Sequence, residues 1–104
     1  MDYTGAVSEI LKSATYDTWF NGLRDAEAAA RINARVRRLS LGNPGDAKAV
    51  GSGVSEMRID YGPGYRVYFQ RRGNTMIVLL CGGDKSTQAK DIKTAKRLAE
   101  TWSD

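Results

Sequence analysis

The chain has 104 residues, which is enough for one domain, 1–104, with a single modest core. Its 16 Lys and Arg residues exceed its 12 Asp and Glu residues, and the resulting net charge of +4 suits an anionic partner without requiring one. The sequence has no histidine, which excludes Ser-His and Cys-His nucleophile pairs and the commonest zinc ligand. Catalysis would have to use carboxylates, lysine, arginine, tyrosine or hydroxyl groups, and we expect no metal and no cofactor.

The single cysteine and the hydropathy pattern indicate the compartment. Cys81 lies in an apolar run, so it is predicted to be a small core residue, and with one cysteine no internal disulfide can form. No apolar stretch approaches the length of a membrane span, and the first residues lack the pattern of a signal peptide. These features predict a cytoplasmic protein with no membrane partner.

The first half of the chain predicts a strand and two helices. Residues 5–12 are the strand, and Thr15 is predicted to cap the first helix, whose apolar side chains have helical spacing: Tyr16, Trp19, Phe20 and Leu23. The second helix follows Asp25 and ends at Gly42. Its apolar stripe is Ala29, Ile32, Val36 and Leu39, and its arginines off the stripe are Arg31, Arg35 and Arg38. The tight connection predicts an antiparallel helical hairpin.

The second half predicts a loop, three strands and a helix. Residues 42–53 are rich in glycine and are predicted to be the loop. The strands are 54–60, 65–71 and 75–81, and the last is apolar on both faces, which is typical of a central strand. A final amphipathic helix starts at Ser86, with a predicted buried side of Ala89, Ile92, Ala95, Ala99 and Trp102. The fold class is therefore α+β, in the order β-α-α-β-β-β-α.

Polar and apolar residues alternate along both arms of the hairpin "RIDYGPGYRVYFQRRG". For the polar residues to share one face, paired residue numbers must have an even sum. A loop centred on Pro63 satisfies this condition and pairs three sets of residues: Asp60 with Arg66, Arg58 with Tyr68, and Glu56 with Gln70. The polar face is either an ordinary solvated face held by Asp60–Arg66 and Glu56–Arg pairs, or a surface that binds RNA. Arginine suits phosphate and tyrosine suits stacking on a base.

The segment "LLCGGDKST" joins the central strand to the last helix and contains two glycines, an aspartate and a lysine. Successive backbone N–H groups at a glycine turn beside a helix N-terminus predict an anion site. The spacing of a P-loop is absent. The turn also brings Lys85 beside the face that carries the arginines.

Three stretches of the chain carry a family resemblance: "RINARVRRLSLGNPGDAKAVG", "GVSEMRIDYGPGYRVYF" and "LLCGGDKSTQAKDIKTAK". They resemble the toxins of type II toxin–antitoxin systems, specifically the HigB-like "addiction module killer protein" group of the RelE/ParE superfamily. The resemblance covers nearly the whole chain. It implies a RelE-like fold, with a twisted, antiparallel-rich sheet, an N-terminal helical hairpin on one face and a C-terminal helix. It also implies a cytosolic antitoxin partner, which we expect to be a helix-turn-helix protein encoded by an adjacent gene.

RelE-like members are ribosome-dependent endoribonucleases that cut messenger RNA and inhibit translation, by attack of a 2′-hydroxyl on the adjacent phosphate. By position, Arg66 matches the arginine of the family's Gly-Tyr-Arg motif, Arg58 a basic residue on the preceding strand, and Lys85 the basic residue after the glycine turn. The last helix reads "AKDIKTAK" where that group has a tyrosine, which leaves Glu56 and Asp84 as candidates for the general base. The candidates for RNA binding are Tyr65, Tyr68, Lys48 and Lys90.

Three functions are compatible with this resemblance. The preferred one is a metal-independent mRNA endoribonuclease whose partners are the ribosome and messenger RNA. The second is a toxin of the ParE type, which binds DNA gyrase and performs no chemistry. The third is a non-catalytic homologue that binds an antitoxin or nucleic acid.

Overall fold

The computed structural model describes residues 7–102 and contains five strands and three α-helices within them. In chain order these are β1 (Glu9–Lys12), α1 (Ala14–Asn21), α2 (Ala26–Ser40), β2 (Ala47–Gly51), β3 (Val54–Ile59), β4 (Tyr65–Arg72), β5 (Met76–Gly83) and α3 (Gln88–Thr101). A short 3₁₀ helix, η1 (Lys85–Thr87), precedes α3. The predicted first strand is therefore observed over Glu9–Lys12, and its residues 5–6 lie outside the described residues.

All five strands form one mixed sheet in the order β1-β5-β4-β3-β2. Strand β1 pairs with β5 in parallel, and the other neighbours are antiparallel. The three strands predicted in the second half are confirmed, and β5 lies inside the sheet with its side chains buried on both faces. The α+β class is likewise confirmed.

Strand β2 corrects the prediction that residues 42–53 are a loop. Residues 47–51 pair with β3 and form one edge of the sheet, with Lys48 opposite Glu56. The segment is mostly exposed and has no clear polar–apolar alternation. Its backbone pairing with β3, and not a side-chain pattern, makes it a strand.

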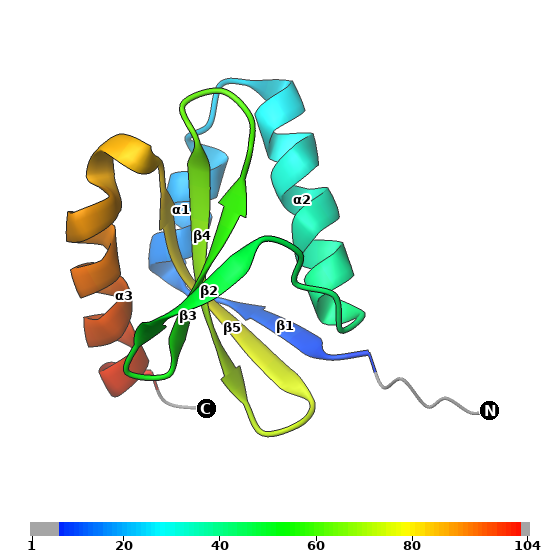
Figure 1. Cartoon of the computed structure of the whole chain (residues 1–104), viewed down its shortest axis with the longest axis vertical. Coiled ribbons are helices and arrows are strands. Elements are labelled where there is room, and N and C mark those ends of the chain that lie inside the picture. Colours follow the sequence, from blue (N-terminus) through cyan, green and yellow to red (C-terminus); the bar gives the residue numbers. More distant parts are fainter. Residues whose placement is uncertain (1–6, 103–104) are drawn as a thin grey trace.

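The helices cover the two faces of the sheet in three layers (Figure 1). Helices α1 and α2 pack on one face, around a core that includes Tyr16, Ile32, Leu39, Met57, Val67 and Leu79. Helix α3 covers part of the other face, around a second core that includes Val54, Tyr68, Val78, Leu80, Cys81 and Ala95. The prediction that Cys81 is a core residue is confirmed, and burial raises the pKa of its thiol to about 12.

The helix ends and buried faces differ from the predictions in three places. Ser13, not Thr15, caps α1: its hydroxyl accepts the N–H of Tyr16 at 2.9 Å and donates to the carbonyl of Leu80 at 2.5 Å. The buried alanine near the start of α2 is Ala28, whereas the predicted Ala29 is only half-buried. In α3, Asp91 is buried and Ala89 is exposed. The Asp91 carboxylate packs against Gly83 of β5 and accepts the Thr87 hydroxyl.

The hairpin of β3 and β4 has the predicted parity but a different register. Arg58 lies opposite Arg66 and Glu56 lies opposite Tyr68, so the polar residues do share a face. The five-residue loop 60–64 is centred on Gly62 and not on Pro63, which moves every pair by two residues. Glycines at positive φ shape this loop, and the Tyr61 hydroxyl donates to the Asp25 carboxylate at 2.9 Å, fixing the loop to the start of α2.

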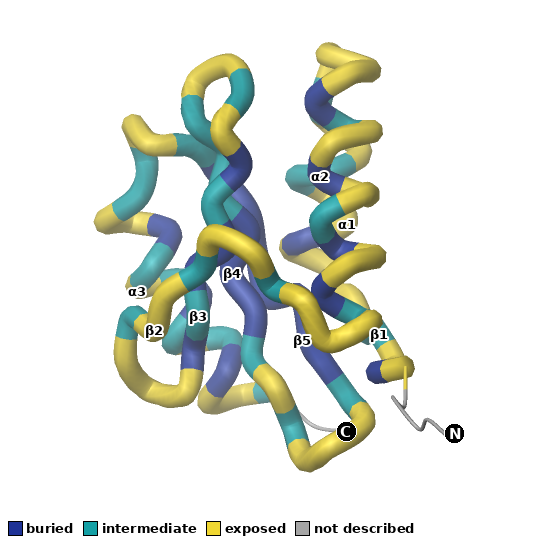
Figure 2. The backbone as a smooth tube through the Cα atoms, turned by 45° about the vertical axis from the view of Figure 1, so that its right-hand side comes forward, coloured by how far each residue is buried: buried dark blue, intermediate teal, exposed yellow. Residues whose placement is uncertain are grey.

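Burial along the β3–β4 hairpin decreases towards the loop 60–64, as the colours in Figure 2 show. Glu56 and Tyr68 are fully buried under α3. Arg58 and Arg66 lie nearer the hairpin loop, where the face opens. The covering by α3 therefore separates a buried polar network from an open basic end.

Candidate functional site

An open pocket of about 420 Å³ lies at the loop end of the β3–β4 hairpin. Its lining residues are Asp46, Arg58, Ile59, Asp60, Gly64, Arg66 and Lys85. The three cations expected to act on phosphate, Arg58, Arg66 and Lys85, thus come from three segments of the chain to one hollow. Two carboxylates line the same pocket: Asp46, from the loop before β2, and Asp60, the first residue of the β3–β4 loop.

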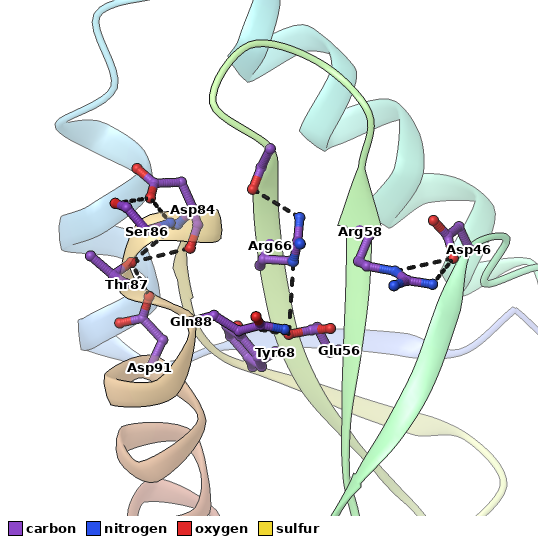
Figure 3. A network of polar contacts seen from close by, with 11 residues as sticks. Asp46, Glu56, Arg58, Arg66, Tyr68, Asp84, Ser86, Thr87, Gln88 and Asp91 are labelled. Atoms are coloured by element: carbon purple, nitrogen blue, oxygen red, sulfur yellow. Dashed lines mark hydrogen bonds and ion pairs between the residues drawn. The ribbon is translucent and has the colours of Figure 1, made fainter.

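Arg66 is the least exposed of these cations. Its side chain retains 12% exposure, and its Nη1 donates to the carbonyl of Gly64 at 3.0 Å (Figure 3). Gly64 has φ +81, and a Cβ there would lie 3.3 Å from Nη1 of Arg66 and 3.4 Å from Cβ of Lys85. Glycine at this position therefore lets the hairpin loop close against both cations.

Glu56 supplies the counter-charge beneath Arg66. Its Oε2 accepts the Tyr68 hydroxyl at 3.0 Å and the Gln88 amide at 2.8 Å, and lies 3.8 Å from Nε of Arg66. Within residues 7–102, Oε1 of Glu56 and Nε of Arg66 have no hydrogen-bond partner. Glu56 has no exposed surface, so in this arrangement it orients the guanidinium and cannot reach a substrate hydroxyl as a base.

Arg58 is paired at the open side of the pocket. Its Nη2 lies 2.8 Å from Oδ1 of Asp46, and the two side chains are 39% and 56% exposed. This hydrogen bond lowers the pKa of Asp46 and raises that of Arg58. Arg35 fixes the loop that carries Asp46, because its guanidinium donates to the carbonyls of Arg58 at 2.6 Å and Pro44 at 3.1 Å. A phosphate entering the pocket would compete with Asp46 for an already positioned arginine.

Asp84 and its neighbours correct the predicted backbone anion site. The Asp84 carboxylate accepts the Ser86 hydroxyl at 2.5 Å and the Ser86 N–H at 2.8 Å, so the chain itself occupies these donors. These hydrogen bonds, that of the Ser86 side chain first, lower the pKa of Asp84, which weakens it as a general base. Lys85, the next residue, is exposed and reaches the pocket.

The two glycines before Asp84 serve close packing and belong to β5. A Cβ on Gly82 would overlap the ring of Trp19, and one on Gly83 would overlap the carboxylate of Asp91. The Thr87 hydroxyl donates to this carboxylate at 2.5 Å. The glycines therefore allow α1 and the start of α3 to approach β5 from opposite faces, and this places Lys85 at the pocket.

The four residues predicted to bind RNA do not line this pocket. Tyr68 is fully buried and bonded to Glu56, and burial above all raises its pKa, so stacking on a base does not fit this position. Tyr65 points to the other face and packs edge-on against Trp19, with ring centroids 6.4 Å apart. Lys48 is exposed on β2 beside a separate hollow of about 280 Å³, and Lys90 is exposed on α3.

The sequence pattern does not reveal two residues of this region, Asp46 and Gln88, and it predicts a different role for a third, Asp60. Asp46 lies directly before β2, a strand that the sequence pattern does not reveal, and reaches the pocket from there. Gln88 bonds Glu56 from the first turn of α3. The sequence predicts Asp60 as a partner of Arg66, whereas the structure places it in the lining of the pocket. Its position in the sequence between Arg58 and Arg66 is the signal that could have indicated this.

Comparison with known proteins places the chain in a family. Residues 18–101 match the family model described as "Phage derived protein Gp49-like (DUF891)". The chain belongs to this family. Gp49-like proteins are addiction-module killer and toxin-like proteins, so the class of function is that of the toxin of a toxin–antitoxin pair, with an antitoxin as partner.

A relative of this Gp49-like protein is found in Haemophilus influenzae and is described as an uncharacterized protein. It is 52% identical over 92 residues, which cover 88% of this chain and 93% of the relative. The alignment thus extends over nearly all of both chains.

The described residues of the Gp49-like chain contain neither a helix that could span a membrane nor a cluster that could hold a metal ion. In residues 7–102, every helix is too short or too polar to cross a bilayer. Within the same residues, Cys, Asp and Glu side chains form no group of three or more that could hold a metal ion.

Proposed function

We propose that this Gp49-like protein is a toxin of the RelE/ParE superfamily, related to the HigB group, that cleaves messenger RNA on the ribosome. The observation that carries the proposal is the convergence of Arg58, Arg66 and Lys85 on one pocket of about 420 Å³. Cations from three segments around one hollow suit a phosphodiester, because negative charge accumulates on its oxygens during cleavage.

The proposed reaction is transfer within the RNA strand. The 2′-oxygen attacks the adjacent phosphorus, the bond from phosphorus to the 5′-oxygen breaks, and the products are a 2′,3′-cyclic phosphate and a 5′-hydroxyl. Arg66 and Arg58 bind the non-bridging oxygens, with Arg66 oriented by Glu56 from below and by Gly64 from the loop. In this scheme Lys85, which is exposed and lines the pocket, donates a proton to the leaving 5′-oxygen.

The removal of the 2′-hydroxyl proton requires a base. Glu56 is enclosed and Asp84 is bonded to Ser86, so neither candidate from the sequence fits as placed. Asp46 is bonded to Arg58. Asp60 is an exposed carboxylate that lines the pocket and, in the described part of the chain, has no side-chain hydrogen bond or ion pair. In this scheme Asp60 is therefore the base that accepts the proton of the 2′-hydroxyl.

The test is expression of the chain alone in a bacterium, followed by primer extension on ribosome-bound messages. We expect growth arrest, new 5′ ends inside translated messages, and restored growth when the adjacent antitoxin is co-expressed. Purified DNA gyrase should supercoil plasmid normally in the presence of the protein. Growth arrest with intact messages and blocked supercoiling would instead assign a toxin of the ParE type, and antitoxin binding without either effect would assign a non-catalytic homologue.

A further inference from the structure

The pocket lined by Arg58, Arg66 and Lys85 is called the basic pocket here, and a second hollow adjoins it on the side of α2. It has a volume of about 270 Å³ and is lined by Arg31, Ala34, Arg35, Arg38, Ile59 and Asp60. Ile59 and Asp60 also line the basic pocket, so these two residues form the common wall. Figure 3 shows α2 beside the strand that carries Arg58, on the side away from Arg66.

The three arginines of this hollow differ in what they already bind. Arg35 donates to backbone carbonyls and so builds the wall. Arg31 bonds Glu27 at 2.8 Å and lies over the Tyr61 ring, 4.6 Å from its centroid. Arg38 is exposed, and within residues 7–102 its side chain has no hydrogen-bond or ion-pair partner. It is therefore the cation of this hollow that is available to a ligand.

The charges alternate across the two hollows. Arg58, Arg66 and Lys85 stand on one side of Asp60, and Arg38 stands on the other. A carboxylate at the common wall repels phosphate and accepts hydrogen bonds from sugar hydroxyls, whereas the arginines on either side attract phosphate. A single RNA strand fits this pattern, because it alternates phosphates with riboses that carry 2′-hydroxyls.

We propose that the hollow beside α2 binds a phosphate of the RNA strand next to the cleaved one, with Arg38 as its contact. This inference rests on the proposed function, because it takes the basic pocket as the place of the cleaved phosphate. Arg38 acts in binding and has no part in the chemical step. The ligand is thus a single-stranded RNA that lies across the Ile59–Asp60 wall.

The chain offers a matched control for Arg38. Arg37 is exposed on the same last turn of α2 and does not line the hollow. Arg38→Ala and Arg37→Ala remove the same charge, the same aliphatic stem and the same interaction with the helix terminus. A difference between the two variants therefore reports the position and not the net charge.

The experiment measures cleavage of a message bound to purified ribosomes, under steady-state conditions. The message carries a neutral methylphosphonate in place of one phosphate flanking the cleaved bond, and each flanking position is tested in turn. In the wild type, one position should raise KM about fivefold, the upper range for an exposed ion pair, with kcat unchanged. In Arg38→Ala, KM should rise to the same extent with the natural message, and the methylphosphonate at that position should have no further effect.

Arg37→Ala should keep the wild-type KM and the wild-type sensitivity to methylphosphonate. The inference is overturned if the methylphosphonate that raises KM for the wild type also raises it for Arg38→Ala. This holds even if the KM of Arg38→Ala for the natural message is raised, because lost contacts with ribosomal RNA would produce the same rise. Absence of cleavage by the wild-type protein would overturn the proposed function itself, and this inference with it. The two failures can be distinguished, because failure of the proposed function appears with the wild-type protein, before any variant is made.

Discussion

Replacing Arg66 by alanine tests the buried pair of Arg66 and Glu56. The change removes the cation 3.8 Å from a carboxylate that has no exposed surface. Removing one partner of a buried ion pair costs about 3–5 kcal/mol. We expect the lower end, about 3 kcal/mol, because Oε2 keeps its hydrogen bonds from Tyr68 and Gln88. For a domain of this size the melting temperature should fall by roughly 12–24 °C.

A second substitution separates the charge effect from loss of packing. In Arg66→Ala/Glu56→Gln the buried group is neutral, so the double variant should recover about 2 kcal/mol relative to Arg66→Ala. The measurement is thermal unfolding followed by circular dichroism. Arg71→Ala is the control, because Arg71 is exposed on the same strand, and it should change stability by less than about 0.5 kcal/mol. Equal stability of the single and double variants would refute the proposed role of Glu56 as counter-charge.

Three further predictions concern the surroundings of the pocket. Ser13→Ala should lower the free energy of unfolding by about 1–2 kcal/mol in urea titrations, because it removes the cap of α1, whereas Thr15→Ala, at an exposed helical position, should cost under about 0.5 kcal/mol. Tyr68→Phe should cost about 1.5–3 kcal/mol through the lost bond to Glu56 and leave the KM for ribosome-bound message unchanged; a raised KM would restore Tyr68 as an RNA contact. Hydrogen bonds from Ser86 lower the pKa of Asp84 in the folded state, so its contribution to stability is present at neutral pH and is lost as the pH falls below the usual value near 3.8. Asp84→Asn should therefore reduce the loss of stability at acid pH. An unchanged dependence of stability on pH would contradict the hydrogen bonds to Ser86.

The parts of the fold that follow from side-chain periodicity could be predicted from the sequence. The two-sided apolar run of β5 gave its interior position, and the alternation along β3 and β4 gave the shared polar face. The register of that hairpin could not follow from periodicity, because parity allows every even shift and the glycine turn selects one of them. Strand β2 could not be predicted either, because backbone pairing with β3 forms it.

The site shows the same division. Residue type and the family resemblance predict the three cations, Arg58, Arg66 and Lys85, and these residues do line one pocket. Whether the predicted bases and tyrosines can reach a substrate depends on which part of the sheet α3 covers, and tertiary packing decides this. Glu56 and Tyr68 read as solvated members of an alternating strand, yet α3 buries both.

Whether the pocket of Arg58, Arg66 and Lys85 acts on the cleaved phosphodiester is tested by the single-turnover rate of message cleavage on the ribosome, measured for Lys85→Ala and its control Lys93→Ala. Both lysines are exposed, one at the pocket and the other on α3 away from it, so both variants should fold and lose the same charge. If three cations act on one phosphodiester, Lys85→Ala should cleave about 10²-fold more slowly than the wild type, while Lys93→Ala stays within about twofold. Equal rates for the two variants would show that Lys85 does not act in cleavage and would overturn the proposed site.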